Sequence, residues 1–476
     1  MSNIRNMDNL NKFKKYFNRD FWRAFQNKQP FFEVPEKKNK KELIVENLYL
    51  ELQDRSYYPS VPHCYVDRDK GNGVTRIIPV FTLKDYCVYY YCIKKIENRI
   101  AFNRIENTFG GWTLGGLMRK SEDDEMEKRR EDFNLYEDFL SELYGISVSE
   151  YSFNPTAWAK AYGDLNAKLY ATAKEGAYKY VAELDIANFY DSIRLDILEM
   201  RVKELVREEC SDIVSILFHF LNYWNRNINL YNKQTVGIPQ DAMGDCSRIL
   251  ANFYLQPYDK AMYQLCTQNN CKYLRYADDQ FLFSENENKL NLLIFKASKT
   301  LNSLGLSVNQ EKVKIFSTEN LINYRSFKIF DLLKNDQDKR DKYKVEQFID
   351  SYLEMRERSL LSKVKGKGVP LLNKALFCPA LSEIKHTKRK KILSCFLDES
   401  YLKNVKSYHL EKIYKLLKNE ERQKFMEILN SLSQKLIHNA FHYELLFFYQ
   451  KNKIDSKSVK QRIKELKNFN FFKLYN

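Results

Sequence analysis

The sequence predicts an α+β protein whose strand-containing part is followed by an all-helical C-terminal part. Strand-type runs end in acids at VAELD (181–185) and KYLRYAD (272–278), and stretches with helical spacing fill most of the remaining chain. Gly and Pro number only 14 and 10 among 476 residues, which favours regular elements over loops. With 44% hydrophobic residues the chain can bury a core, so a disordered protein is excluded.

The net charge of +16 is concentrated in the C-terminal third. Residues 325–476 hold about 34 Lys and Arg against about 18 Asp and Glu, which accounts for the whole excess. A basic segment of this kind can follow a phosphate backbone, although a soluble basic helical domain has the same composition.

Cysteine usage and the N-terminus indicate the compartment. The nine cysteines are scattered without a CxxC pair, which favours reduced thiols over zinc or disulfides. The first twenty residues contain no apolar signal core, and no run reaches the 18 apolar residues of a membrane span. We expect a cytoplasmic protein with no membrane partner.

The N-terminal elements are predicted as helices, then a hairpin, then a helix. Residues 1–60 read as mostly helical, with apolar side chains at helical spacing at Leu43, Ile44, Leu48 and Leu52. Two β-rich runs flank the turn signal at 69–73, which predicts a hairpin over 64–82. The apolar run that follows, 83–100, predicts a long helix.

The middle of the chain alternates loops, strands and helices. The glycine-dense NTFGGWTLGG (107–116) lacks the spacing of nucleotide-binding loops and predicts an irregular loop. Helices are expected at 121–150, 153–177 and 194–224. VAELDIANFYDSI (181–193) predicts a strand that leads into a helix.

The rest of the chain, from residue 237 onward, is predicted to contain helices, two paired strands and a further strand-like segment. GIPQDAMGDCSRILANFYL (237–255) begins as a turn and ends as a helix, and CKYLRYADDQFLFS (271–284) predicts two strands around a tight acidic turn. A helix ends near Gly305, a strand-like segment follows at 307–316, and the pattern is helical from about 326 onward.

Asp185 and Asp278 are each the first strong acid at the end of a strand-type run. Strand ends can present carboxylates to a cleft while the sheet keeps its hydrogen bonds. Two such acids can share Mg²⁺ ions, and a pair of ions stabilises both the attacking and the leaving oxygen of phosphoryl transfer. A DD pair alone is expected by chance among 62 acids, so the order of the surrounding motifs decides.

Five motifs in one order make the sequence resemble reverse transcriptases, the right-hand polymerases with fingers, palm and thumb. The resemblance runs from about 57 to 316, and the motifs are RDKGNGVTRIIPVFTLKD (68–85), LDIANFYDSI (184–193), GIPQ with SRILANFYL (237–240 and 247–255), YADD (276–279) and GLSVNQEK (305–312). The resemblance implies an N-terminal helical segment at 1–60, fingers and an antiparallel palm sheet at 61–325, and a basic helical thumb and C-terminal domain at 326–476.

The resemblance also implies the chemistry of the palm. Asp185, Asp278 and Asp279 would be catalytic and would hold two Mg²⁺ ions, Asp185 and Asp278 as the principal ligands. Lys312 would donate a proton to the leaving pyrophosphate, although an exposed turn explains this lysine nearly as well.

Substrate-binding residues are implied in the same way. Lys70 and Arg76 would hold the triphosphate of the incoming deoxynucleotide, and solvated hairpin charges are the alternative. Tyr190 stands where the family places a bulky gate against the ribose 2′-OH, and a core Tyr beside Phe189 is the alternative. Gln240 would border the nucleotide and the template.

One departure from the common pattern narrows the implied role. Family members of retroelements usually read PQG and then Ser-Pro, whereas here Gln240 is followed by DAMGDCSR without proline. The variant resembles bacterial defence-associated and abortive-infection reverse transcriptases. It implies an RNA-directed DNA polymerase of antiphage defence that self-associates, uses a dedicated non-coding RNA and makes a DNA product.

Three alternatives stay open. A retron or mobile-element reverse transcriptase would share every palm motif, a palm fold that only binds RNA would lack chemistry, and RNA-templated RNA synthesis is disfavoured by Tyr190. Outside the motifs, His438 and His442 in HNAFH have the spacing of a metal pair. Because Asn439 stands where a zinc protease needs Glu, ordinary helix positions are expected there.

Overall fold

The computed structural model describes residues 7–26, 35, 37–70, 74–102, 104–115, 151, 153–154, 157–206, 208, 210–225, 237–241, 243–364 and 368–467. The chain divides into two units. The first comprises Met1–Tyr65 and Ile78–Thr318, and the second comprises Val66–Ile77 and Glu319–Asn476. The domain limits expected from the sequence stay predictions, and the helix expected at 121–150 lies outside the described residues.

A five-stranded sheet forms the centre of the first unit. In hydrogen-bonded order its strands are β3 (Thr108–Phe109), β5 (Lys272–Tyr276), β6 (Asp279–Ser284), β4 (Tyr180–Leu184) and β7 (Lys314–Ser317). Neighbouring strands are antiparallel except β3 and β5, which run parallel. The sequence predicted only a loop at 107–116, because a two-residue strand is too short to show an alternating pattern.

The helices of the first unit match most of the expected positions. They are α1 (Leu10–Tyr16), α2 (Arg19–Gln26), α3 (Lys38–Gln53), α4 (Leu83–Phe102), α7 (Ala157–Lys174), α8 (Phe189–Ser192), α9 (Leu195–Val206), α10 (Ser211–Tyr223), α11 (Asp245–Gln268) and α12 (Glu287–Ser303). A short 3₁₀ helix, η2 (Gln310–Lys312), precedes β7. Among the helices described, none is both long and apolar enough to cross a membrane.

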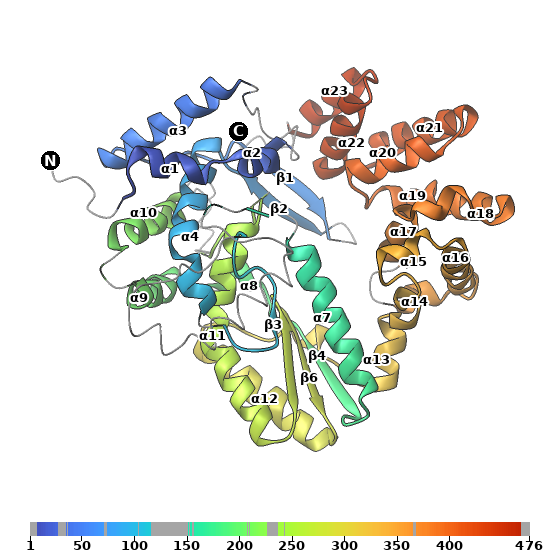
Figure 1. Cartoon of the computed structure of the whole chain (residues 1–476), viewed down its shortest axis with the longest axis horizontal. Helices are drawn as coiled ribbons and strands as arrows, with labels where there is room; N and C mark the ends of the chain where they lie inside the picture. The colour runs from blue at the N-terminus through green and yellow to red at the C-terminus, as the bar shows by residue number, and fades with distance from the viewer. Residues whose placement is uncertain are drawn as a thin grey trace. The chain divides into compact units, whose positions relative to one another are not determined.

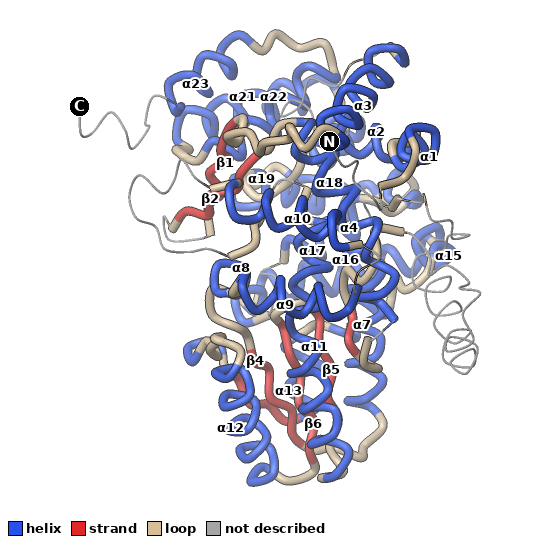
Figure 2. Tube along the Cα trace, turned by 90° about the vertical axis from the view of Figure 1, so that its left-hand side faces the viewer, coloured by secondary structure: helices blue, strands red, loops and turns tan. Residues whose placement is uncertain are grey.

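Helices cover both faces of the sheet (Figures 1 and 2). Side chains of a strand alternate between faces, and in β5 Tyr273 and Arg275 contact Asp259 of α11, whereas Tyr276 lies on the other face. There its hydroxyl donates to the backbone oxygen of Trp158 in α7, at 3.1 Å. The central strands β4, β5 and β6 are therefore largely buried on both sides, which explains why their sequences are mostly apolar, whereas β7 is more exposed.

Aromatic side chains join the N-terminal helices to α4. The rings of Phe13 and Tyr91 lie 4.6 Å apart between centroids, as do those of Phe21 and Tyr90. Such tilted and edge-to-face pairs add to the stabilisation from burial. The run VYYYCI, which reads as an apolar helix, thus supplies the surface on which α1 and α2 pack.

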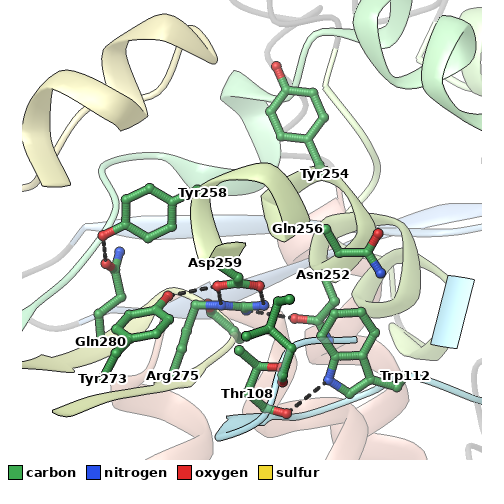
Figure 3. Close-up of polar contacts among 12 residues, drawn as sticks. Thr108, Trp112, Asn252, Tyr254, Gln256, Tyr258, Asp259, Tyr273, Arg275 and Gln280 are labelled. Carbon is green, nitrogen blue, oxygen red and sulfur yellow. Dashed lines mark hydrogen bonds and ion pairs between the residues drawn. The ribbon is translucent and has the colours of Figure 1, made fainter. Parts of the chain in front are cut away.

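A buried ion pair joins α11 to β5 directly beneath the acidic turn (Figure 3). The guanidinium of Arg275 donates to both carboxylate oxygens of Asp259, at 2.7 and 2.6 Å, and both side chains are fully buried. It also donates to Asn252 at 2.8 Å and to the backbone oxygen of Ala277 at 2.9 Å. Tyr273 donates to the same Asp259 carboxylate at 2.7 Å.

Further contacts extend this network to the edge of the sheet. Asn252 donates to the backbone oxygen of Gly111 at 2.8 Å, and the Trp112 ring lies 5.9 Å from the Arg275 guanidinium carbon. Trp112 in turn donates to the backbone oxygen of Thr108 in β3, at 3.1 Å (Figure 3). The loop at 107–115 is thereby tied to the helix and strand that carry the motifs.

The described elements of the second unit beyond residue 318 are all helical. They are α13 (Thr318–Tyr324), α14 (Phe327–Asp331), α15 (Asp336–Arg340), α16 (Lys342–Glu357), η3 (Leu360–Lys363), α17 (Val369–Leu376), η4 (Pro379–Ser382), α18 (His386–Phe396), α19 (Glu399–Leu402), α20 (Ser407–Leu416), α21 (Asn419–Lys435), α22 (Asn439–Lys451) and α23 (Lys457–Lys467). Fully buried apolar side chains such as Phe348, Phe396 and Phe425 form its core. This confirms the helices expected from residue 326 onward.

The predicted hairpin is present as β1 (Cys64–Asp69) and β2 (Thr75–Val80). Its bases belong to the first unit, and its outer part, Val66–Ile77, belongs to the second. Near the tip the Lys70 amide donates to the backbone oxygen of Val74 at 2.8 Å.

We predict that Asp259→Asn lowers the free energy of unfolding by about 3–5 kcal/mol, because it leaves the buried Arg275 charge without its partner. Urea denaturation followed by circular dichroism measures the change. As a control, Glu175→Gln removes a half-exposed partner of Lys272 at 3.7 Å and should cost less than about 1 kcal/mol. Equal, small losses for both variants would contradict the role given to the buried pair.

Candidate active site

Asp185 lies immediately after β4, at the end of the sheet where the β5–β6 turn also lies. In the register of β4 with β6, Leu184 pairs with Gln280, so Asp185 follows on the level of Asp279. Asp185 is only 8% exposed. Its backbone oxygen accepts from the Asn309 amide at 2.8 Å, which holds the loop before η2 against it.

Asp278 occupies a two-residue turn between β5 and β6, with Ala277 as its other member and Tyr276 paired to Asp279 across it. Ala277 has a φ of +51°, a left-handed conformation that usually calls for Gly at this position of a hairpin. The Arg275 guanidinium binds the Ala277 oxygen and stabilises this backbone. The buried cation thus sets the direction of the acidic turn.

The three carboxylates influence one another electrostatically. Burial raises the pKa of Asp278 to about 6, and the neighbouring Asp279 and Asp185 carboxylates add to the rise. Burial disfavours the charged form of the Asp278 carboxylate, and nearby negative charges disfavour it further. Asp185, Asp278 and Asp279 are therefore brought together, as the sequence predicted.

Lys312 lies against the first of these acids. Its ammonium is 3.0 and 3.2 Å from the two carboxylate oxygens of Asp185, and the side-chain Nδ2 of Asn309 donates to one of them at 3.4 Å. Lys312 also opposes the pKa rise of Asp278. The ammonium places a positive charge where the acids repel one another.

Tyr190 and the GIPQ segment lie beside the acids. Burial raises the pKa of the Tyr190 hydroxyl, Arg248 opposes this, and the Asp278 carboxylate adds to the rise. The Ile238 amide donates to the Tyr190 backbone oxygen at 3.1 Å, and a Cβ on Gly237 would lie 2.0 Å from that oxygen. Only glycine at position 237 lets the two backbones come this close. Gln240 lies three residues further along the same segment.

The unusual Asp241 organises the loop before α11. Its carboxylate accepts from the amides of Met243 and Gly244, both at 3.0 Å, and from the Ser247 hydroxyl at 3.5 Å. Ser247 also lies 2.9 Å from the Tyr89 hydroxyl of α4. Asp241 stands where the PQG pattern has glycine, and its carboxylate stabilises the turn that follows by accepting these amide hydrogen bonds.

Lys70 and Arg76 lie on the outer part of the hairpin, in the second unit, and both are exposed. The acids lie in the first unit. The proposed grip of these two residues on a triphosphate stays a prediction.

The donor set fits divalent cations. Carboxylate oxygens are the ligands that Mg²⁺ prefers, and the raised pKa of Asp278 reflects a repulsion that a cation would relieve. Within the described ranges, no three His, Cys, Asp or Glu side chains are already grouped to hold an ion. At Asp185 the Lys312 ammonium pairs with the carboxylate and offsets part of its charge.

An antiparallel sheet that presents paired carboxylates from a strand end and an adjacent hairpin turn has the arrangement of a polymerase palm. Residues 136–350 match the family described as reverse transcriptase (RNA-dependent DNA polymerase). The chain carries a reverse transcriptase domain and resembles bacterial reverse transcriptases.

Individual proteins show more limited similarity. The retron Ec83 reverse transcriptase of Escherichia coli is 28% identical over 123 residues, which cover 25% of this chain and 37% of that relative. Among solved structures, telomerase from Candida albicans with a fragment of telomeric RNA has a TM-score of 0.34 at 13% identity, covering 86% of this chain and 67% of that one. Apo telomerase from Candida tropicalis has a TM-score of 0.32 at 12% identity, covering 90% and 74%.

Sequence reasoning missed the residues that support the site. Arg275 was read only as part of a strand and Asn252 only as part of the SRILANFYL motif, and Asp259 was not singled out. A charged residue in the middle of an apolar run, as Arg275 is in YLRYA, was the available signal, since such a residue needs a buried partner.

We predict that Asp278→Asn raises the Tm of the metal-free protein at pH 8. The folded-state pKa of about 6 exceeds the ordinary value of 3.8, so the charged carboxylate destabilises the fold above about pH 6. This penalty shrinks as the pH falls from 6 towards 4, and the advantage of the Asn variant should shrink with it.

Thermal melts of both proteins in chelator at pH 8 and pH 4.5 measure the effect, and other titrating groups cancel in the comparison. At pH 8, Mg²⁺ should stabilise the wild type more than the variant. A difference in Tm that stays constant between the two pH values would contradict the assignment.

Proposed function

We propose that this chain is an RNA-directed DNA polymerase that adds deoxynucleotides to a primer hydroxyl. The observation that carries the proposal is the β4–β6 register, which sets Asp185 beside the Asp278–Asp279 turn. The mutual effect of these carboxylates on the pKa of Asp278 supports a site that requires cations. The match of residues 136–350 supports the reaction class.

Each residue has a proposed part in the reaction. Asp185 and Asp278 hold two Mg²⁺ ions with Asp279 completing the acidic site, and the ions when bound supply charge stabilisation for the attacking and leaving oxygens. Lys312 keeps Asp185 neutralised while the site is empty of substrate and then provides a proton to the leaving pyrophosphate. Lys70 and Arg76 hold the triphosphate.

Selectivity for deoxynucleotides is assigned to Tyr190. Its backbone is fixed by the Ile238 amide, and its ring lies close enough to Asp278 for the carboxylate to affect its hydroxyl. A bulky side chain held there excludes a ribose 2′-OH by contact. Gln240, on the segment packed against Tyr190, borders the nucleotide and the template.

The proposed biological role is bacterial antiphage defence with a dedicated non-coding RNA as template or scaffold. The loop built around Asp241 supports this, because it replaces the PQG pattern of retroelement enzymes. The basic C-terminal helices suit an RNA partner. The nine free cysteines suit a cytoplasmic enzyme, and self-association is part of the proposal.

A retron reverse transcriptase is the second candidate, favoured by the similarity to the retron enzyme over 123 residues. Sequencing the RNA and DNA that co-purify with the protein separates the two. A DNA covalently joined to a branched RNA would favour the retron, and a DNA product not so joined would favour the defence enzyme.

We predict that Asp185→Asn and Asp278→Asn each reduce Mg²⁺-dependent dNTP incorporation by at least about 10²- to 10³-fold, since each removes a ligand of the cations that stabilise charge on the reacting phosphate. Primer extension on an RNA template measures this. Glu285→Gln, an exposed acid at the far end of β6, serves as the control and should retain activity. Persistent synthesis by both Asp variants would refute the proposed chemistry.

We predict that Tyr190→Ala increases incorporation of ribonucleotides relative to deoxynucleotides by about 10- to 100-fold, because the 2′-OH then fits. The ratio of kcat/KM values for rNTP and dNTP measures it. Tyr190→Phe keeps the bulk without the hydroxyl and should discriminate like the wild type. An unchanged ratio in the Ala variant would remove Tyr190 from the gate role.

A further inference from the structure

The HNAFH motif, read from the sequence as ordinary helix positions, contacts the β1–β2 hairpin. His438 and Asn439 begin α22, and the Asn439 side-chain oxygen accepts from the Asp67 amide of β1 at 2.7 Å. The His438 ring nitrogen Nε2 lies 2.9 Å from the Thr75 hydroxyl of β2. These bonds join residues more than 360 positions apart in the sequence, and all four residues belong to the second unit.

The helical side of this contact is rigidly built. His442 is fully buried, with its ring nitrogens 3.1 Å from the His438 backbone oxygen and 2.9 Å from that of Ser433. Asn439 is 4% exposed. The two histidines thus make hydrogen bonds at the corner between α21 and α22.

The hairpin side needs such support. A two-stranded hairpin is at best marginally stable alone, and the outer residues of β1 and β2 are exposed. One bond reaches each strand, three residues before Lys70 and one residue before Arg76. Burial raises the pKa of Asp67, which agrees with a packed rather than a solvated strand. The two bonds therefore restrain the strands close to Lys70 and Arg76.

We infer that His438 and Asn439 are positioning residues for the incoming nucleotide: they hold the hairpin that carries Lys70 and Arg76, and so make nucleotide binding depend on the C-terminal helical unit. The inference rests on the proposed function, which assigns the triphosphate to Lys70 and Arg76. Small displacements of groups that hold a substrate have large effects on rate and affinity. Coupling between two sites is reciprocal. If the hairpin contact with His438 and Asn439 favours nucleotide binding, nucleotide binding should in turn stabilise that contact.

The first arm of the test measures the contact without any need for activity. Hydrogen–deuterium exchange of the full-length protein should show faster exchange in the segment 64–80 of Asn439→Ala, by about tenfold at the Asp67 amide, since that amide loses its acceptor. Exchange in the palm strands should stay unchanged. Wild-type exchange at Asp67 in the variant would overturn the inference.

The second arm measures nucleotide use on an RNA template with a DNA primer. Thr75→Val removes the hydroxyl and keeps the branched shape, and it should raise the KM for dNTP by about three- to tenfold, while the affinity for primer–template stays unchanged. Thr75→Ser keeps the hydroxyl and should behave like the wild type. His438→Ala should match Thr75→Val, and combining the two should add little, since they remove the same bond.

The outcomes separate the two proposals. If the wild type incorporates no dNTP, the proposed function fails and the nucleotide coupling fails with it, whereas the exchange experiment still decides whether the contact holds the hairpin. If the wild type is active and Thr75→Val leaves KM unchanged, the positioning role is overturned and the proposed function stands.

Discussion

The antiparallel pairing of β4 with β6 is the constraint on which the site depends. It sets the end of β4 on the level of the β5–β6 turn, so that acids separated by about ninety residues in the sequence meet at one end of the sheet. Side chains alternate along a strand, so a slip of one residue would turn Asp185 to the other face. A slip would also disturb the close packing of the buried side chains of β4 and β6, which favours the observed register.

Two groups of charges lie at the site: a buried ion pair next to the acidic turn, and the acids themselves with Lys312. Beneath the turn, the buried Arg275 is neutralised by Asp259 and uses a remaining donor to hold the strained Ala277 backbone. Its charge is thus balanced locally by a buried partner. At the surface of the site the exposed Lys312 ammonium pairs with Asp185, and carboxylate oxygens are the ligands that a divalent cation prefers.

The sequence predicted the local features of the site better than its long-range support. Asp185, Asp278 and Lys312 could be found because strand ends and motif order are readable in a linear sequence, and the structure places them together. Asp259 and Asn252 could not be assigned, since their role depends on which strand α11 covers. The same holds for the short parallel strand β3 and for the contact of Asn439 with Asp67. Both depend on tertiary packing, and no local sequence pattern predicts them. The hairpin was predictable from the turn signal between its two β-rich runs, α4 from its long apolar run, and the C-terminal helices from their helical pattern.

The central claim is that Asp185 and the Asp278–Asp279 turn share one cation site. Iron-directed cleavage tests it most directly: Fe²⁺ substituted for Mg²⁺ and treated with ascorbate and peroxide generates radicals that cut the backbone near the bound ion. We expect two cuts in the same protein, one near residue 185 and one near residues 278–279, both suppressed by excess Mg²⁺ and both lost in Asp278→Asn. A cut at only one of these segments, or cuts that survive in Asp278→Asn, would contradict a shared site.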